Sequence, residues 1–493
     1  MAVSSRTVFA VSLLLMPQLA TAASVCVLRS GDRLLLVQDM AARWQFPGGH
    51  AEAGETRAQT AHRETLEETG ADVTSSTALP IEGKVHVFAC QARTPLQVQG
   101  RAVNILAAPH VGREVIQARL VTRAEARQLR TRFPDQLERT FARMADVPES
   151  ALQPVEHFGP ATPFRHAEVE RVKHTQQWSL GPVAKLGNVL GEFWFYLLAM
   201  PVLWLAFGAR ATRLMLMALM LVTVVVQGLK AWIAVPRPFS FDPALSLVGA
   251  GGPAMPSGHT ASATAFFLLV ALWLAGKYAA GMRHRQLGLI AMALLAGGLA
   301  GLSRVWLGVH YWSDVGVGLV LGVAVALAIY ALGCRLSSTH SHDLDERACW
   351  AALAVVSLIA GLCWWTTALL LPLSVAIACV LAPRRGPEDV SLRSAAVLLA
   401  GLLLFAGFCL PIAQRAEPFV LEAGLQAMVY AAMGVWIAWG AGALAAAWTR
   451  RRMSGQAVPG WRYGEPPRAS THGVDLLECG RKRPRNWHAP PAQ

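Results

Sequence analysis

The hydrophobic residues of this 493-residue chain follow two different patterns. Between residues 24 and 180, short apolar stretches alternate with polar ones, and the segment "SVCVLRSGDRLLLVQD" predicts a β-hairpin at the start of this region. From residue 188 to 450, the chain is instead a succession of apolar runs, which is typical of membrane-spanning helices. We therefore expect a mixed α/β domain followed by an all-α, polytopic membrane region.

The apolar runs predict about nine spans, although several runs are shorter than the roughly 20 residues that a membrane helix needs. They cover residues 189–208, 212–229, 260–276, 286–302, 315–333, 348–364, 367–382, 394–413 and 427–448.

The loops between these runs carry different charges on alternate sides. Every second loop is rich in Lys and Arg, whereas the loop 239–258 has neither residue and the loop 414–426 has one. Residues 1–23 contain a basic residue, Arg6, then an apolar stretch, and then small residues at the end, which is the pattern of a secretory signal. An uncleaved signal anchor would give the same orientation. The positive-inside rule then predicts a protein of the bacterial inner membrane with a periplasmic N-terminal domain and a cytoplasmic C-terminus.

Composition agrees with this interpretation. The chain is 54% hydrophobic and only 15% charged, whereas a soluble domain has roughly 25% charged residues. The net charge of +13 could indicate nucleic-acid binding, but much of the excess falls in short loops and in the tail, so we expect no nucleic-acid partner. Cys26 and Cys90 fall on two predicted strands. They would pair if the domain is exported, but we favour two buried thiols.

Three polar motifs interrupt the membrane region, and the predicted topology brings all of them to the external face. They are "KAWIAVPRP" with Lys230 and Arg237, "PSGH" with Ser257, Gly258 and His259, and "SRVWLGVHYWSD" with Arg304, His310 and Asp314.

These residues suit phosphoryl transfer through a covalent phosphohistidine. The three cations can surround the phosphoryl oxygens, and the backbone amides of Ser257 and Gly258 can face the same oxygens where a new helix begins. Asp314 lies four residues after His310, so it can orient the imidazole that attacks phosphorus, while His259 is placed to protonate the leaving oxygen. The cations already neutralise the phosphate, so we expect no cofactor at this site.

The three motifs resemble those of the type 2 phosphatidic acid phosphatase (PAP2) superfamily, K-x6-RP, PSGH and SR-x5-H-x3-D, with every fixed position matched. The resemblance covers roughly residues 185–335. It implies a helical bundle, a phosphohistidine at His310 and lipid phosphates or isoprenoid diphosphates as substrates. Many membrane members have three spans before the first motif, whereas this sequence predicts two.

A further motif lies in the N-terminal region, in "GGHAEAGETRAQTAHRETLEETGA". Glu64, Glu67 and Glu68 are spaced i, i+3 and i+4, so one face of a helix would carry three carboxylates, and Gly70 would end that helix. A divalent cation relieves the repulsion among them, and ligands that are all oxygen favour Mg²⁺ or Mn²⁺.

This stretch resembles the Nudix box, because Gly49, Glu55 and Arg63 also stand at the family's spacing. The resemblance covers about residues 24–145, and it implies an α/β/α sandwich that hydrolyses a diphosphate linked to another group. Thr65 stands where the family usually has a bulkier apolar residue.

The sequence therefore predicts a bifunctional membrane hydrolase in six parts. They are a signal peptide (1–23), a Nudix domain (24–145), a linker (146–185), a PAP2 phosphatase domain (186–335), four additional spans (336–450) and a disordered basic tail (451–493).

The expected partners are a membrane lipid phosphate and a diphosphate-containing compound. Undecaprenyl diphosphate is the favoured lipid substrate, and phosphatidylglycerol phosphate and lipid A phosphate stay open. Two alternatives also stay open: a phosphatase whose Nudix domain only binds or senses a diphosphate, and a transporter built on the four additional spans.

Overall fold

The computed structural model divides the chain into two compact units, which we describe separately. The N-terminal unit combines residues 1–178 with two later segments, 233–255 and 307–311, and the remainder forms the helical unit. Most of the predicted signal, residues 1–22, and most of the predicted tail lie outside the residues that the structure describes. The described residues are 23–40, 42–81, 85–156, 158, 162–338, 342–364, 367–383, 390–416 and 419–455.

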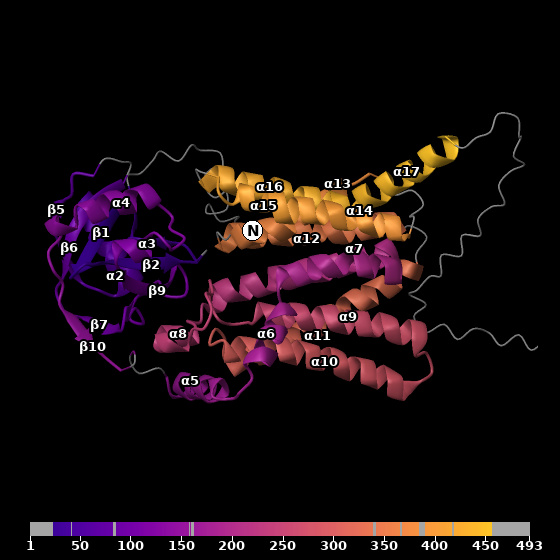
Figure 1. The fold of residues 1–493 in the computed structure, drawn as a ribbon, viewed down its shortest axis with the longest axis horizontal. Coiled ribbons are helices and arrows are strands. Elements are labelled where there is room, and N and C mark those ends of the chain that lie inside the picture. The colour runs from indigo at the N-terminus through magenta and orange to yellow at the C-terminus, as the bar shows by residue number, and fades with distance from the viewer. Residues whose placement is uncertain are drawn as a thin grey trace, which may run out of the picture. The chain divides into compact units, whose positions relative to one another are not determined.

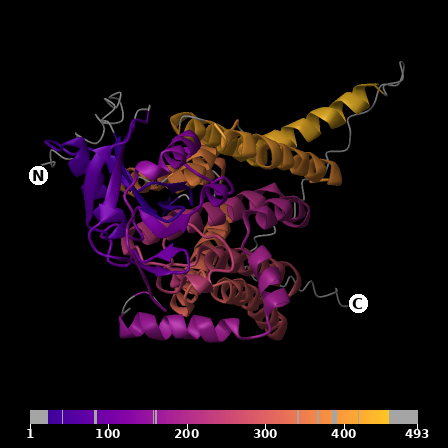
Figure 2. The same ribbon diagram turned by 60° about the vertical axis from the view of Figure 1, so that its left-hand side comes forward.

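A mixed ten-stranded sheet forms the centre of the N-terminal unit (Figures 1 and 2). Its strand order is β10-β7-β8-β9-β2-β1-β6-β5, with β3 paired to β2 and β4 paired to β1. The strands are β1 (Ala23–Ser30), β2 (Arg33–Asp39), β3 (Trp44–Gln45), β4 (Gly48–His50), β5 (Val73–Ala78), β6 (Val85–Ala92), β7 (Leu96–Gln99), β8 (Ala102–Val103), β9 (Val115–Val121) and β10 (Leu152–Pro154).

The central strands β1 and β2 are buried on both faces, which explains their almost continuous apolar sequences. One face packs with Ala61 of helix α2 (Arg57–Thr69), and the other packs with residues of α3 (Arg123–Ala126) and α4 (Pro134–Ala142). The unit is therefore an α/β sandwich with helices on both sides of the sheet, and the predicted fold class of this part is confirmed.

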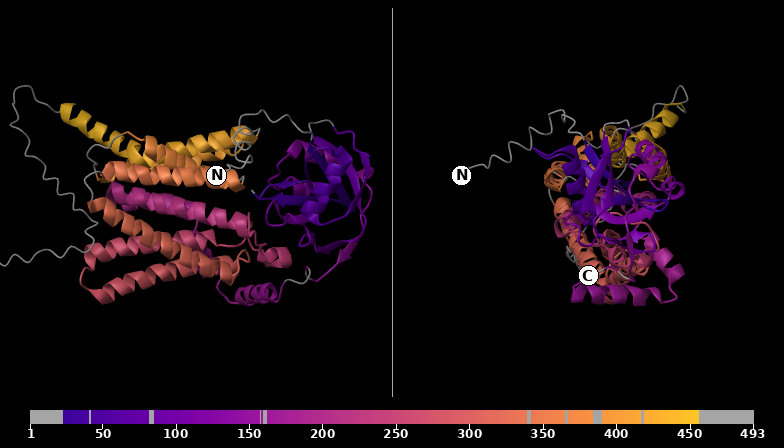
Figure 3. Two further views of the ribbon diagram at one scale, coloured as in Figure 1. Left: turned by 180° about the vertical axis from the view of Figure 1, so that it is seen from behind. Right: turned by 90° about the vertical axis from the view of Figure 1, so that its left-hand side faces the viewer.

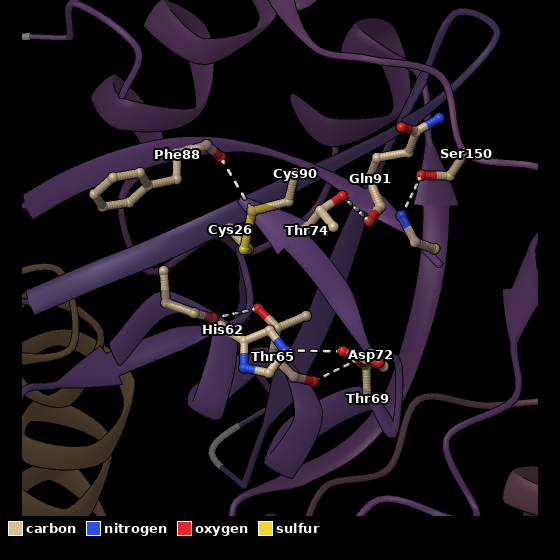
Figure 4. Close-up of a disulfide and its surroundings, with 12 residues drawn as sticks. Cys26, His62, Thr65, Thr69, Asp72, Thr74, Phe88, Cys90, Gln91 and Ser150 are labelled. Carbon is tan, nitrogen blue, oxygen red and sulfur yellow. Dashed lines mark hydrogen bonds and ion pairs between the residues drawn. A yellow bond between two sulfur atoms is a disulfide. The ribbon is translucent and has the colours of Figure 1, made fainter. Parts of the chain in front are cut away.

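A disulfide joins Cys26 of β1 to Cys90 of β6, with 5.6 Å between the two Cα atoms (Figure 4). The prediction of two buried thiols is therefore wrong. The reason lies in the strand register: β1 and β6 are parallel neighbours, and Leu28 lies opposite Cys90, which puts Cys26 one diagonal step away on the same face.

The helical unit contains long apolar helices that run side by side (Figures 1 and 3). Its elements are α6 (Gly181–Val189), α7 (Phe193–Ile233), α9 (Gly258–Tyr278), α10 (Arg283–Trp306), α11 (Trp312–Ser338), α12 (His342–Trp364), η3 (Thr367–Leu369), α13 (Leu370–Leu381), α14 (Leu392–Leu402), the π-helical η4 (Leu403–Cys409), α15 (Leu410–Ala413), α16 (Phe419–Val435), the π-helical η5 (Trp436–Gly440) and α17 (Ala441–Gly455).

Seven helices among the described residues are long and apolar enough to cross a membrane, which indicates a multi-pass membrane protein. The difference between these seven helices and the expected nine spans arises in two places. The first two predicted runs both lie in α7, which joins two helices across a kink at Gly208, where φ is 83° and ψ is 172°. The run at 367–382 gives α13, which has only 12 residues.

Candidate active sites

The Nudix-like motif begins on a helix whose ends are fixed by local sequence. Thr56 caps α2 and exchanges hydrogen bonds with Gln59 in a capping box. Gly70 ends the helix with φ of 71°, and its N–H donates to Leu66 O. The Thr65 hydroxyl is fully buried but satisfied, because it donates to Ala61 O at 2.7 Å. The motif therefore lies on a regular helix with defined ends.

Arg63 connects the acidic residues of this motif. Its Nε donates to Glu55 Oε1 at 2.7 Å, and its Nη1 donates to Glu67 Oε2 at the same distance. Its Nη2 also lies 3.0 Å from Glu64 Oε1. The hydrogen bond from Arg63 lowers the pKa of Glu55 to about 2, so Glu55 is a permanent anion that anchors the guanidinium.

Glu64 and Glu68 lie one turn apart on the buried side of α2. Burial raises the pKa of Glu64, and burial raises the pKa of Glu68 to about 8. Glu68 accepts a hydrogen bond from the backbone N–H of Gly48 at 2.9 Å. A Cβ atom at position 49 would overlap the Glu64 carboxylate, so any larger residue there would have to displace that carboxylate.

Two residues that the sequence analysis missed also lie at this site. His110 Nδ1 lies 2.9 Å from Glu114 Oε2 and 3.8 Å from Glu67 Oε2. The negative charge of Glu114 contributes to the raised pKa of Glu64 and of Glu68. Both residues lie in a loop outside the box, 40 and 44 residues after Gly70, and only folding brings them to α2.

Two of the three predicted carboxylates are suited to binding a divalent cation. Glu64 and Glu68 are buried oxygen donors whose ionisation is costly without a counter-charge, which suits Mg²⁺ or Mn²⁺. Glu67 is instead tied to Arg63, and within the described residues no three His, Cys, Asp or Glu side chains are gathered as a metal cluster. Glu64 and Glu68 are thus the residues best placed to hold the ion.

The predicted phosphatase residues are divided between the two units. Arg237 and His310 belong to the N-terminal unit. The other six, which belong to the helical unit, are Lys230, Ser257, Gly258, His259, Arg304 and Asp314.

Arg237 and His310 are in direct contact. Arg237 Nη1 lies 3.3 Å from His310 Nε2 and also donates to Val309 O at 2.6 Å. Its Nε donates to Gly252 O at 2.7 Å, and its Nη2 donates to Gly251 O at 2.5 Å. Because a guanidinium has no acceptor, the Nε2 atom that faces it carries the lone pair, and the imidazole proton lies on Nδ1. Three carbonyls therefore fix the arginine that orients this histidine.

The segment that carries Arg237 is anchored on the N-terminal sheet. Ser240 Oγ donates to Ile116 O of β9 at 3.3 Å. Asp242 accepts from Gln99 Nε2 of β7 at 3.3 Å and lies 3.2 Å from Lys173 Nζ of α5 (Pro163–Gln176). Ser240 lies in the short helix α8 (Pro238–Phe241), and Asp242 lies between α8 and the helical turn η2 (Pro243–Leu245).

In the helical unit, the "PSGH" motif forms the start of α9. Ser257 is the N-cap residue, yet its side chain does not cap the helix, because its hydroxyl accepts from Thr260 Oγ1 at 2.9 Å. The first amides of α9 can therefore face an anion. The Ser257 N–H donates to the backbone carbonyl of Asp314, which is fully buried in the first turn of α11. Lys230 is buried in the last turn of α7.

Arg304 and His259 are linked through two residues that no predicted motif contains. Arg304 Nη1 donates to Asn188 Oδ1 at 2.7 Å, and Asn188 Nδ2 donates to Glu192 Oε1 at 2.8 Å. His259 Nε2 lies 3.4 Å from the same Glu192 oxygen. The only sequence signal for this pair is an acidic residue placed directly before an apolar run.

Comparison with known proteins assigns two parts of the chain to families. Residues 18–144 match the model of the NUDIX domain, and residues 211–337 match that of the PAP2 superfamily. The chain is a fusion of a NUDIX domain and a PAP2 domain. The predicted family resemblances are confirmed, and so is the prediction of a hydrolase at the level of these two domain families.

Curated relatives match the PAP2 domain. Phosphatidylglycerophosphatase B of Bacillus subtilis (strain 168) is 36% identical over 95 residues, which are 19% of this chain and 44% of the relative. Lipid phosphate phosphatase 1 of Arabidopsis thaliana is 37% identical over 86 residues, 16% of this chain and 25% of the relative. The chain thus spans less than half the length of these relatives.

Solved structures are similar to part of this chain. A NUDIX hydrolase from Nitrosomonas europaea is similar over 26% of this chain and 90% of its own, at 20% identity and a TM-score of 0.21. An ADP-ribose pyrophosphatase from Streptococcus suis 89-1591 is similar over 27% of this chain and 97% of its own, at 16% identity and a TM-score of 0.19.

Proposed function

We propose that this chain is a bifunctional membrane hydrolase. Its PAP2 domain would remove phosphate from a lipid phosphate or an isoprenoid diphosphate through a phosphohistidine at His310. Its NUDIX domain would hydrolyse a diphosphate with the help of Mg²⁺. Phosphate- and diphosphate-bearing substrates are those that the two families handle.

The contact between Arg237 and His310 carries the phosphatase proposal. It leaves the Nε2 lone pair of His310 directed at a cation, where a phosphoryl group would also be held. In the proposed reaction, Nε2 attacks phosphorus and the bond from phosphorus to the leaving oxygen breaks. His259 gives its proton to that oxygen. Water then attacks phosphorus and gives a proton to His259, the bond from phosphorus to Nε2 breaks, and inorganic phosphate leaves, which regenerates both histidines.

The remaining residues would stabilise the charge that develops on the phosphoryl oxygens. The amides at the start of α9, Lys230 and Arg304 supply positive charge or N–H donors without a metal ion. Arg304 is 7% exposed, and its buried Nε has no hydrogen-bond partner among the described residues, which leaves a donor for a ligand.

An apolar groove in the helical unit supports a lipid substrate. Its volume is about 680 Å³, and its lining includes Trp194 and Phe207 of α7 and Phe266 of α9. Glu192, which contacts His259, lies on the same lining, so the groove starts at the polar residues and follows α7 away from them. We propose that the hydrocarbon chain of the substrate occupies this groove, because burial of a chain there leaves its phosphate beside His259.

The Cys26–Cys90 disulfide supports a periplasmic position for the NUDIX domain and both sites, because disulfides persist in oxidising compartments. The distribution of Lys and Arg among the loops points to the same side of a bacterial inner membrane. Undecaprenyl diphosphate is the favoured isoprenoid substrate, because both motifs suit phosphoanhydride chemistry.

At the NUDIX site, Glu64 and Glu68 would hold the cation, and Glu55 and Arg63 would keep α2 in place. A bound divalent cation would polarise the diphosphate and lower the cost of ionising these glutamates. The alternative is a domain that binds or senses a diphosphate without cleaving it. The ion pair between Glu67 and Arg63 favours this alternative, because it engages one of the three expected ligands.

One experiment tests both activities. Purified full-length protein is assayed against lipid monophosphates and diphosphates, with and without EDTA. We expect His310→Ala to abolish phosphate release from lipid substrates and EDTA to leave that release unchanged. EDTA should stop diphosphate hydrolysis by the NUDIX domain, and Glu67→Gln serves as its control. Strong EDTA sensitivity of lipid phosphate release would contradict the phosphohistidine mechanism. Binding without hydrolysis at the NUDIX site would favour the sensing alternative.

A further inference from the structure

We propose that Asn188 and Glu192, which lie outside the three PAP2 motifs, are positioning residues that hold Arg304 and His259 in their working orientation. This inference rests on the proposed phosphatase function and adds two residues to it. All four side chains belong to the helical unit. The two new residues come from the end of α6 and from the turn that follows it.

The hydrogen bonds form a continuous chain from a cation to an imidazole. Arg304 donates to Asn188, Asn188 donates to Glu192, and the Glu192 oxygen that accepts this bond also faces His259 Nε2. The successive distances are 2.7, 2.8 and 3.4 Å. Movement of either end therefore disturbs the other.

The Asn188 amide can have only one orientation in this chain. Its oxygen must face the guanidinium of Arg304, which has only donors, and its NH₂ must face the carboxylate of Glu192, which accepts when ionised. The flipped amide would place NH₂ against a cation and oxygen against an anion. Asn188 thus transmits a fixed polarity that aspartate or leucine would not reproduce.

Close backbone packing holds α6 against α10, and it holds the turn after α6 against His259 of α9. A Cβ atom at Gly187 would lie 2.5 Å from the carbonyl oxygen of Leu299, so α6 approaches the backbone of α10 closely and delivers Asn188 to Arg304. A Cβ at Gly191 would lie 2.5 Å from His259 Cδ2 and 2.6 Å from its Cβ. The imidazole therefore rests on the Gly191 backbone while its Nε2 faces Glu192.

The charge of Glu192 suits a histidine that must donate a proton. An anion beside Nε2 stabilises the imidazolium form by charge attraction. The other charged groups at this end of the packed helices are Lys230 on α7, Arg304 on α10 and Asp314 on α11. Hydrogen bonds from the two neighbours His259 and Asn188 keep Glu192 ionised.

The test is the pH profile of phosphate release from phosphatidic acid by the full-length protein in detergent. Glu192→Gln keeps an oxygen that can accept from Asn188 but removes the charge. We expect the alkaline limb of the kcat profile to move about one pH unit lower, so that kcat falls about tenfold at pH 8.5 and is unchanged at pH 5.5. Glu192→Asp, which keeps the charge, should retain the limb of the unmodified protein. Asn188→Leu should instead raise KM about tenfold, because Arg304 loses its orienting acceptor.

Glu422→Gln is the matched control. Glu422 is half-buried in α16, and its Oε1 accepts from an amide, that of Gln426, at 2.9 Å. This variant should leave both kcat and KM unchanged. A Glu192→Gln profile that superimposes on that of the unmodified protein, or that falls equally at every pH, would overturn the inference alone. Absence of phosphate release by the unmodified protein would instead overturn the proposed phosphatase itself.

Discussion

Binding of Mg²⁺ to the NUDIX domain should depend steeply on pH because of Glu68. Its carboxyl group is 4% exposed, and burial raises its pKa to about 8 in the metal-free protein. A cation binds the ionised carboxylate, so it must displace a proton at neutral pH. Burial also raises the pKa of Glu64, which adds to the same effect.

The size of the effect follows from the ionised fraction of Glu68. With a pKa of about 8, roughly 3% of the group is ionised at pH 6.5 and about three quarters at pH 8.5. The apparent Kd for Mg²⁺ should therefore fall about 25-fold over this range, with about one proton released per ion bound at pH 7.

Isothermal titration calorimetry of the full-length protein in detergent measures both quantities. Titrations in two buffers with different ionisation enthalpies give the number of protons released. Glu68→Gln should bind Mg²⁺ weakly and with little pH dependence, whereas the variant of the exposed Glu52, Glu52→Gln, should behave like the unmodified protein. A Kd that is constant between pH 6.5 and 8.5, with no proton release, would refute the reasoning.

The same carboxyl group should make the stability of the metal-free domain depend on pH. The pKa of Glu68 is higher in the folded protein than the unfolded value of 4.5, so its stabilising contribution is complete below that value and is lost as pH rises through about 8. In EDTA, the free energy of unfolding should fall between pH 5 and 8 by at most about 1.4 kcal/mol per pH unit. Glu68→Gln should remove this fall in denaturant titrations.

Three further predictions follow from other contacts. Replacing both Cys26 and Cys90 by Ala should lower the free energy of unfolding by about 4 kcal/mol, because the disulfide joins residues that are 64 positions apart. An unchanged midpoint in a denaturant titration would contradict this. Gly49→Ala should displace the Glu64 carboxylate, cost about 1–3 kcal/mol and abolish Mg²⁺-dependent diphosphate hydrolysis, which a turnover assay and a melting curve check together. Asp242→Ala should loosen the segment that carries the PAP2 arginine and reduce lipid phosphate release several-fold; equal loss of diphosphate hydrolysis would indicate general misfolding instead.

The sequence alone determined the class of each unit and the local motifs. The helix α2 depends on short-range interactions: a capping box at Thr56, three-and-four spacing of its glutamates and a glycine at its end. Because such signals span only a few residues, the pattern was sufficient to predict them. The apolar runs likewise predicted the long apolar helices, and the break between the first two runs coincides with Gly208, where α7 joins two helices across a kink.

Only the tertiary structure decided which distant groups meet. Cys26 and Cys90 pair because of the register between β1 and β6, and composition carries no information about register. His110 comes to α2 from a loop, and Asn188 reaches Arg304 because a glycine lets α6 approach α10. These contacts join residues that are from 43 to 116 positions apart. The physical reason is that hydrophobic periodicity specifies which face of an element is buried, whereas the partner of a polar group on that face is set by how the packed elements are aligned.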